Sequence, residues 1–325
     1  MSANLKSDGY TGKETYFRPS VAVDGVVLTI TNDLANVFEL DDDVDKNKTY
    51  IQARKKTLIK DEELDVGDYW NAGDLKVLLI KRKAIRKDGS KRPFYGYWAL
   101  PGGFIRSMEN AEDALERELV EEAQFYLEKN NIIPHQIGFY SNPKRDEYNF
   151  DSTDNPSLHK QVMSVAYAAI LNKEVIPFSG SDAEEARYFK IKDVLNGEIP
   201  RGRLAFDHNN ILNDSLSYIS EKMKFTPIAL DFLEEEFTIG DIRSVYEAFW
   251  SITDNLDSID LSNFHKKVLS QKDQDGNPVI FPSTKSKNKK KKQPGKGAPA
   301  KLYVRNKKSK EFSLVMSPTK NRNRV

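Results

Sequence analysis

"LPGGFIRSMENAEDALERELVEEAQF", residues 100–125, joins two adjacent glycines to a run of carboxylates. We expect residues 111–125 to form a helix. On that helix Glu118, Glu121 and Glu122 lie at positions i, i+3 and i+4, so they share one face. Because like charges on one face repel, a purely structural helix gains nothing from this arrangement. The pattern therefore points to a chemical role.

A divalent cation would remove the repulsion between these carboxylates. Mg²⁺ and Mn²⁺ prefer carboxylate oxygens and keep several waters, and such an ion polarises a diphosphate and generates an attacking hydroxide. Arg117 is placed to pair with Glu121 at i, i+4. We take Glu118, Glu121 and Glu122 as candidate metal ligands and, with Arg117, as candidate catalytic residues. The alternative is an ordinary charged amphipathic helix.

The same stretch resembles the Nudix box, Gly-x5-Glu-x7-Arg-Glu-U-x-Glu-Glu-x-Gly-U, in which U is aliphatic. Gln124 stands where the pattern has glycine, and Phe125 stands where it has an aliphatic residue. Glycine lets a helix end in a left-handed turn, so Gln124 is expected to cost about 1 kcal/mol there or to let the helix run on through residues 126–130. The matching residues are Gly103, Glu109, Arg117, Glu118, Leu119, Glu121 and Glu122.

Composition is typical of a globular chain of one large or two smaller domains, with 325 residues, 38% of them hydrophobic and 30% charged. The chain has no cysteine, which excludes disulfides and cysteine-ligated zinc. The N-terminal start is polar, and no apolar run is long enough to cross a bilayer. We therefore expect a cytoplasmic protein with no membrane partner.

Charge divides the chain unevenly. Residues 285–325 hold 15 basic residues and one acidic residue, whereas residues 1–284 hold 35 basic and 48 acidic residues. Such asymmetry predicts a polyanionic partner for the C-terminal end, most often nucleic acid. The alternative is a solvated lysine tail.

The order of predicted elements indicates two domains. Strands are expected at 20–31, 75–83, 164–171 and 185–191, and an amphipathic helix at 206–224. Helices at 237–250 and 260–271 then precede two strand-like runs around a lysine-rich loop, the order of a winged helix-turn-helix. We assign residues 1–225 to an α/β (α+β) domain with an acidic insertion at about 33–74, 226–306 to the winged helix, and 307–325 to a basic tail.

The wider chain is similar to the Nudix-related transcriptional regulators, because "WALPGGFI", "FTIGDIRSVYEAFW" and "DLSNFHKKVL" follow in that family's order. The resemblance implies a Nudix fold, with a mixed sheet between helices, that senses ADP-ribose or a related nucleotide. It also implies a winged helix that binds operator DNA as a homodimer near genes of NAD metabolism. The competing interpretation is a Mg²⁺-dependent hydrolase of the ADP-ribose pyrophosphatase type, and slow hydrolysis of its own inducer would combine both.

Candidate ligand contacts lie in and beside the box. They are Gly102, Gly103, Phe104 and Arg145, since an arginine at 145 can grip a diphosphate bidentately; a plain surface loop is the alternative for Arg145. We expect His208 to be a neutral, hydrogen-bonded structural residue.

Candidate DNA contacts lie at the exposed start of the second predicted helix, where such motifs read the major groove, and in the wing. A solvated face is the alternative. The candidates are Ser262, Asn263, His265, Lys266, Lys267, Lys296 and Lys301.

Overall fold

The computed structural model describes residues 19–30, 74–84, 93–145, 161–172, 177, 183–253, 261–273, 275–284 and 300–309. The predicted acidic insertion lies outside these residues except for its last position, Asp74. Lys296 and residues 310–325 of the predicted tail also lie outside them.

The strands of the first unit form one mixed sheet around β1. Val, Ile and Thr are frequent in β1, which suits a strand that is buried on both faces. It runs parallel to β6, with Ser20 opposite Val162 and Thr29 opposite Leu171. All the other pairings in this sheet are antiparallel. The strands are β1 Ser20–Ile30, β2 Leu75–Arg82, β3 Trp98–Ala99, β4 Gly102–Phe104, β5 His135–Tyr140, β6 Val162–Leu171 and β7 Ala183–Lys190.

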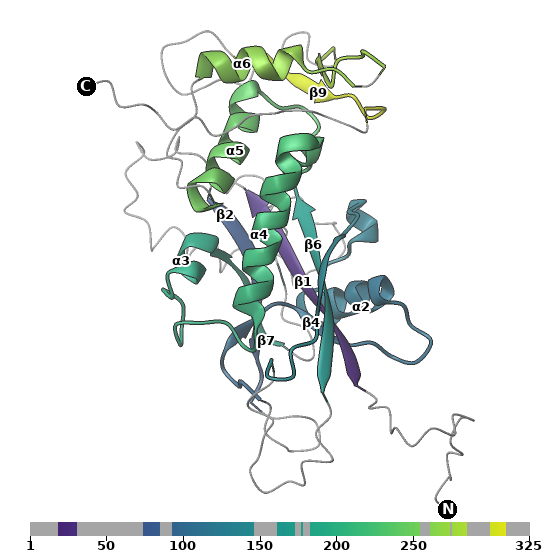
Figure 1. Cartoon of the computed structure of the whole chain (residues 1–325), viewed down its shortest axis with the longest axis vertical. Coiled ribbons are helices and arrows are strands. Elements are labelled where there is room, and N and C mark those ends of the chain that lie inside the picture. The colour runs from purple at the N-terminus through teal and green to yellow at the C-terminus, as the bar shows by residue number, and fades with distance from the viewer. Residues whose placement is uncertain are drawn as a thin grey trace, which may run out of the picture.

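Helices cover both faces of the sheet (Figure 1). Because side chains alternate along a strand, Val26 and Leu28 of β1 pack in the cluster that contains α4, whereas Val27 packs in the cluster that contains α2. The helices of this unit are α2 Ala111–Ala123, α3 Ile191–Leu195 and α4 His208–Phe225, with a short 3-10 helix at Glu128–Asn130. The mixed sheet between helices is confirmed.

Helix α4 follows the amphipathic pattern predicted for residues 206–224. Ile211, Leu212, Leu216 and Ile219 are all buried, as their spacing predicts. The helix ends at Phe225, two residues before Pro227, whose ring cannot continue it.

The second unit contains helix, helix and hairpin in the predicted order. Its elements are the 3-10 helix η5 Pro227–Phe232, α5 Ile239–Thr253, α6 Leu261–Ser270, β8 Ile280–Pro282 and β9 Tyr303–Arg305. Thr238 and Asp241 form a capping box at the start of α5: the Thr238 N–H donates to Asp241 (2.8 Å), and the Asp241 N–H donates to the Thr238 hydroxyl (3.1 Å). In α6, Phe264 and Val268 are buried, whereas Leu269 is 42% exposed.

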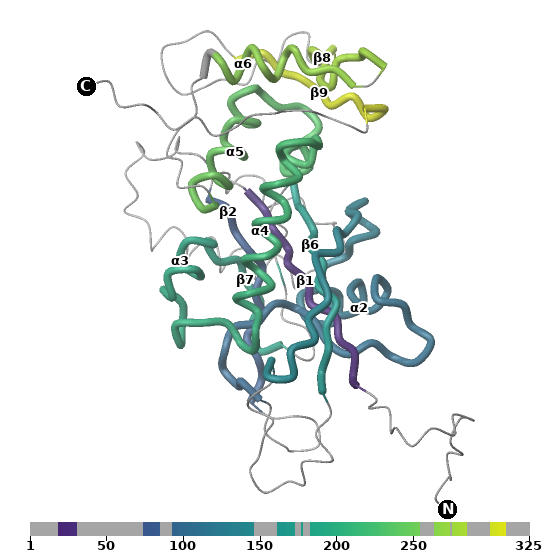
Figure 2. Tube along the Cα trace, in the orientation of Figure 1, coloured from purple at the N-terminus to yellow at the C-terminus, as the bar shows by residue number. Residues whose placement is uncertain are grey.

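Helix α4 belongs to both units. Figure 2 follows it from the sheet to the part built from α5, α6 and β9. Ile219 and Met223 of α4 lie in one apolar cluster with Tyr246 and Phe249 of α5. The core therefore continues from the sheet into the second unit. In the described part of the chain, no helix has the length and apolarity needed to span a bilayer.

The Tyr246 hydroxyl donates a hydrogen bond to a carbonyl near the C-terminal end of α4 that lacks an N–H partner within the helix. The residue four positions after Met223 is Pro227, which has no N–H to donate to the Met223 carbonyl. The Tyr246 hydroxyl donates to that carbonyl instead, at 2.9 Å and in a buried position.

Tyr246→Phe is therefore expected to lower the free energy of unfolding by about 1–2 kcal/mol, because a buried carbonyl loses its donor. Chemical denaturation measures the change. Tyr218→Phe, at a partly buried position of α4, is the control and should change stability little. Equal stability of wild type and Tyr246→Phe would contradict this reading of the junction.

Candidate functional site

Both ends of α2 are fixed by local interactions. The Asn110 side chain accepts the Asp113 N–H at 2.8 Å, which caps the first turn. At the other end Gln124 adopts the left-handed conformation, with φ 52° and ψ 34°. The N–H groups of Gln124 and Phe125 donate to the carbonyls of Val120 and Leu119. The helix therefore stops at Ala123, and the alternative in which it runs on through residues 126–130 is wrong.

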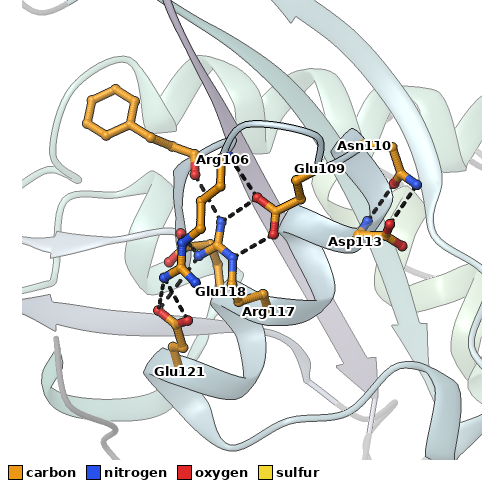
Figure 3. Close-up of polar contacts among 8 residues, drawn as sticks. Arg106, Glu109, Asn110, Asp113, Arg117, Glu118 and Glu121 are labelled. Atoms are coloured by element: carbon orange, nitrogen blue, oxygen red, sulfur yellow. Dashed lines mark hydrogen bonds and ion pairs between the residues drawn. The ribbon is translucent and has the colours of Figure 1, made fainter.

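Arg117 is the centre of the charge network on α2 (Figure 3). Its guanidinium donates to Glu109 from Nε (2.7 Å) and from Nη2 (2.9 Å), and it also pairs with Glu118. Nη2 reaches the Phe104 carbonyl at 2.9 Å, which ties α2 to β4. The predicted pair with Glu121 is longer, with 3.7 Å between Nη1 and Oε2. Arg117 therefore serves mainly to join Glu109, Glu118 and β4.

This pairing changes the acidity of Glu109. Hydrogen bonds from Arg117 and from the Arg106 N–H lower the pKa of the Glu109 carboxyl from 4.5 to about 2. Glu109 therefore stays ionised throughout the neutral and mildly acidic range.

The three carboxylates predicted as metal ligands have separate partners. The Glu121 carboxylate accepts from the Arg106 guanidinium at 2.9 and 3.3 Å (Figure 3). Glu122 is buried and accepts the Gly102 N–H at 2.8 Å. Burial raises the pKa of the Glu118 carboxyl, and its hydrogen bond with Arg117 opposes that rise.

The two glycines before α2 make close approaches that exclude a side chain. A Cβ at Gly103 would lie 2.4 Å from Oε1 of Glu118, and a Cβ at Gly102 would lie 2.2 Å from the Val23 carbonyl oxygen. Both distances are shorter than any normal contact. The glycines therefore let β4 pack directly against both α2 and β1.

A cavity of about 130 Å³ opens beside the glycines. It lies between β1, β4 and the start of α4, and the 57% exposed ring of Phe104 stands at its edge. Two cationic side chains, Arg82 and Arg145, reach it. Its lining residues are Ala22, Asp24, Arg82, Pro93, Leu100, Gly102, Gly103, Phe104, Arg145, Val162, Phe206 and His208.

Arg145 is buried between two carboxylates at this cavity. Its side chain is only 6% exposed, so the surface-loop alternative is wrong. The guanidinium donates to Asp207 from Nε (3.0 and 3.2 Å) and Nη2 (2.8 Å), and Nη2 also reaches Asp24 at 3.1 Å. Burial lowers the pKa of Arg145, but its bonds to Asp207 and Asp24 outweigh that effect and raise it. Arg145 therefore keeps its positive charge.

Asp24 is a residue of the candidate site that the sequence analysis missed. It accepts from the Ser164 hydroxyl at 2.6 Å, and Nε2 of His208 lies 3.4 Å from it. Burial alone would raise the pKa of Asp24, but interactions with His208, Arg145 and Ser164 hold it well below its usual range. The signal for it was a lone carboxylate inside the apolar strand "SVAVDGVVLTI", which burial permits only with charged or hydrogen-bonding partners.

His208 has the structural role that was predicted for it. Its Nδ1 accepts the buried N–H of Leu100 at 2.9 Å, so its proton lies on Nε2, the atom that faces Asp24. His208 thereby holds the start of α4 against the loop that precedes β4.

Comparison with known proteins matches residues 69–213 to the NUDIX domain. The chain is 33% identical over 146 residues to the ADP-ribose pyrophosphatase of Methanocaldococcus jannaschii, a match that covers 45% of this chain and 68% of that protein. The chain belongs to the Nudix family.

Two further comparisons concern the Nudix-related regulators. The chain is 26% identical over 180 residues to the ADPR responsive transcriptional repressor NtrR of Acinetobacter baylyi, across 54% of this chain and 60% of that protein. NrtR of Shewanella oneidensis, solved in complex with a 27mer DNA, shares the fold with a TM-score of 0.53 at 19% identity, over 90% of this chain and 97% of that one. The added C-terminal unit is thus part of a known Nudix architecture.

The Nudix box accordingly spans β4 and α2 in this chain. Its carboxylates suit Mg²⁺ or Mn²⁺ chemically, but the conformation does not arrange them around a metal. Among the described residues, no group of three or more His, Cys, Asp or Glu side chains is placed to hold a metal ion. A cation bound at Glu121 would first have to displace Arg106. The assignment of Glu118, Glu121 and Glu122 as metal ligands therefore stays a prediction.

The predicted DNA contacts that the structure describes lie at the end of the molecule formed by α6 and β9 (Figure 1). Asn263, His265, Lys266 and Lys267 are exposed on α6, while of Ser262 only the helical backbone is described. Lys301 is exposed beside β9, with Nζ 5.5 Å from the centre of the Tyr303 ring. A hollow of about 540 Å³ on this wing is lined by Asn277, Phe281, Arg305, Asn306, Lys307 and Lys308.

Gln124→Gly is expected to raise the free energy of unfolding by about 0.5–1 kcal/mol. A glutamine in the left-handed conformation costs the folded state about 1–2 kcal/mol, which glycine avoids. Glycine also has more conformational freedom in the unfolded chain, which offsets part of this stabilisation. Thermal or chemical denaturation measures it. Asn131→Gly is the control: Asn131 has φ 53°, and asparagine tolerates this conformation, so the gain there should be smaller. A loss of stability in Gln124→Gly would refute the assigned helix end.

The Glu109 pair predicts a dependence of stability on pH. Because the pKa of Glu109 falls from 4.5 to about 2 on folding, its contribution is complete above pH 4.5 and is lost as the pH falls toward 2. Across that window, Glu109→Gln should reduce the proton uptake on unfolding by up to about one proton. Denaturation series at several pH values measure this slope, with Glu128→Gln at an exposed position as the control. Parallel slopes for wild type and Glu109→Gln would contradict the assignment.

Proposed function

We propose that this chain is a ligand-sensing transcriptional regulator. Its Nudix domain binds ADP-ribose or a related nucleotide, and its winged helix binds operator DNA as a homodimer near genes of NAD metabolism. The observation that carries the proposal is the position of α4. His208 at its first position lines the cavity, and Met223 in its last turn packs against the helices of the second unit. One rigid element thus joins the ligand site to the DNA-binding unit.

The chemistry of the cavity suits a nucleoside diphosphate. Arg82 and Arg145 supply guanidinium groups that bind phosphate oxygens, and Arg145 is paired with two carboxylates in this structure. Gly102 and Gly103 let a ligand approach the backbone closely. Pockets that enclose a whole drug-sized ligand hold about 300–1,000 Å³, so a cavity of about 130 Å³ takes the diphosphate and leaves the base outside. The exposed Phe104 ring stands at the edge, where a base could stack on it. The ligand-responsive repressor among the relatives supports the same class of ligand.

The charge of the second unit suits DNA. Lys266 and Lys267 on α6 and Lys301 beside the wing are exposed at one end of the molecule, and the sequence adds many more basic residues beyond position 284. Lysines near phosphates give sequence-independent, salt-sensitive affinity, whereas helix side chains that reach base edges give specificity. The 27mer DNA bound by NrtR, which has the same fold, supports this assignment.

A second function is favoured by specific observations. The chain is 33% identical to an ADP-ribose pyrophosphatase, and the carboxylates of the Nudix box are present at Glu118, Glu121 and Glu122. A Mg²⁺-dependent hydrolase would use these carboxylates, after Glu121 has exchanged Arg106 for the metal. A regulator that slowly hydrolyses its inducer would reset its own switch.

One titration separates the two functions. Binding to duplexes from upstream of the chain's own gene and of NAD-metabolism genes is followed by fluorescence anisotropy, with and without ADP-ribose, and hydrolysis with Mg²⁺ is assayed on the same sample. We expect specific binding that ADP-ribose weakens, with little hydrolysis. Rapid hydrolysis that Glu122→Gln abolishes, together with only non-specific DNA binding, would establish the enzyme and refute the regulator.

The DNA surface has its own quantitative test. The double variant Lys266→Ala/Lys267→Ala is expected to weaken binding and to reduce the slope of log affinity against log salt by up to about 2, one for each lost phosphate contact. Lys129→Ala/Lys144→Ala, at exposed positions of the Nudix domain, is the matched control and should leave the slope unchanged. An unchanged slope in the α6 variant would exclude this face as the DNA contact.

A further inference from the structure

The ion pair of Arg145 with Asp207 joins the Nudix cavity to the start of helix α4. We infer that this pair is a latch: a ligand diphosphate that takes the Arg145 guanidinium frees the Asp207 carboxylate to cap α4, and this exchange signals ligand binding to the second unit. The inference rests on the proposed function and assigns a residue-level switch to it.

Asp207 occupies the position directly before α4, where aspartate normally caps the helix by accepting an N–H of the first turn. Here its side chain makes no capping bond, and its backbone, with φ −95° and ψ 20°, lacks the extended conformation typical of an N-cap. Its carboxylate instead accepts three hydrogen bonds from Arg145. The first turn of α4 contains no acidic residue that could take over the capping role. The helix thus has a good capping residue that is engaged elsewhere.

Of the two carboxylates on Arg145, Asp207 is the one that a ligand would release. Asp24 is held independently by the Ser164 hydroxyl and lies beside His208, so it stays fixed to the sheet. In the part of the chain that the structure describes, the hydrogen bonds to the Asp207 carboxylate all come from Arg145. A diphosphate binds arginine bidentately, as a carboxylate does, and its negative charge repels the carboxylate that it replaces.

The N–H groups at the start of α4 can bind the freed Asp207 carboxylate. The N–H groups of the first turn of α4 carry the positive end of the helix dipole, and a carboxylate that caps them stabilises the helix. Asp207 therefore has two alternative partners, Arg145 and the N–H groups at the start of α4. The ligand binds tightly only when Asp207 has left Arg145. Because the ligand binds the two arrangements unequally, it shifts the equilibrium between them.

The change at Asp207 can reach the DNA-binding unit through packed contacts. Residue 207 must change its backbone conformation to cap the helix, which moves the first turn of α4 relative to the sheet. At the other end of α4, the Tyr246 hydroxyl holds the Met223 carbonyl, and the hydroxyls of Ser220 and Thr253 lie 3.2 Å apart. Helix α5 therefore has to follow α4, and α6 packs on α5 through the Phe264 and Tyr246 rings.

The variant Asp207→Ser tests the latch, because serine caps a helix as well as aspartate does but cannot form an ion pair with Arg145. We expect Asp207→Ser to bind ADP-ribose at least as tightly as wild type does, since the competitor for Arg145 is gone. Its DNA affinity should equal that of ligand-saturated wild type and should no longer change with ADP-ribose, whereas the wild-type affinity changes by about fivefold or more.

Asp214→Ser is the matched control. It removes the same charge from α4 itself, but the Asp214 carboxylate accepts from the Tyr140 hydroxyl, whereas the Asp207 carboxylate accepts from Arg145. This variant should keep the full response of DNA affinity to ADP-ribose. A normal response in Asp207→Ser, or an equal loss in Asp214→Ser, would overturn the latch.

Hydrogen exchange tests the latch without DNA, with inorganic pyrophosphate and ADP-ribose as probes on the full chain. In wild type, either probe should slow exchange at the Asn209 amide, while in Asp207→Ser this amide should exchange slowly from the start. If the probes bind, by calorimetry, but leave this amide unchanged, the latch is refuted and the proposed function stands. If ADP-ribose does not bind at all, the proposed function fails and the latch fails with it.

Discussion

The packing of one helix against two partners is the constraint on which the rest of the molecule depends. Helix α4 buries Ile211, Leu212 and Leu216 in the cluster that includes one face of the sheet, and the same cluster continues through Met223 to the aromatic residues of α5. Burial of each such side chain contributes about 1.5–3 kcal/mol, so neither partner can move away from α4 without a large loss. The Tyr246 hydroxyl reinforces this junction at the carbonyl that Pro227 cannot satisfy. The cavity beside Gly102 and Gly103 and the second unit are therefore mechanically connected.

The chemistry of the Nudix box is organised by a second constraint, the pairing of arginines with carboxylates. Arg117 binds Glu109 and Glu118 and ties both to β4, whereas Arg106 binds Glu121. Charges that would repel on a bare helix thereby become part of a stable network of ion pairs. At the cavity, Arg145 likewise forms ion pairs with Asp24 and Asp207. The two networks differ in burial: the Arg106 and Arg117 side chains are 61% and 15% exposed, whereas the Arg145 side chain is 6% exposed. The proposed latch uses the most buried of these arginines.

Patterns that arise from local physics could be read from the sequence. The apolar spacing of α4, the capping residues of α5 and the β-branched strands β1 and β6 all correspond to predicted elements. Strand β5 was not predicted, because "HQIGFY" shows no clean alternation. The partners of Arg145 could not be found either, since Asp24 and Asp207 are far from it in the chain and only the fold brings them together. The end of α2 at Gln124 could not be decided from the sequence for a similar reason. Packing of Phe125 into the core outweighs the local cost of the left-handed conformation at Gln124.

Coupling between the two units is the central claim, and thermodynamic reciprocity tests it most directly. If ADP-ribose weakens DNA binding by some factor, then DNA must weaken ADP-ribose binding by the same factor. Calorimetric titration of ADP-ribose into the full chain, alone and saturated with its specific duplex, measures that factor. A ligand affinity reduced about fivefold or more in the presence of the duplex is predicted. Equal affinities with and without the duplex would show that the two sites are independent and that α4 transmits nothing.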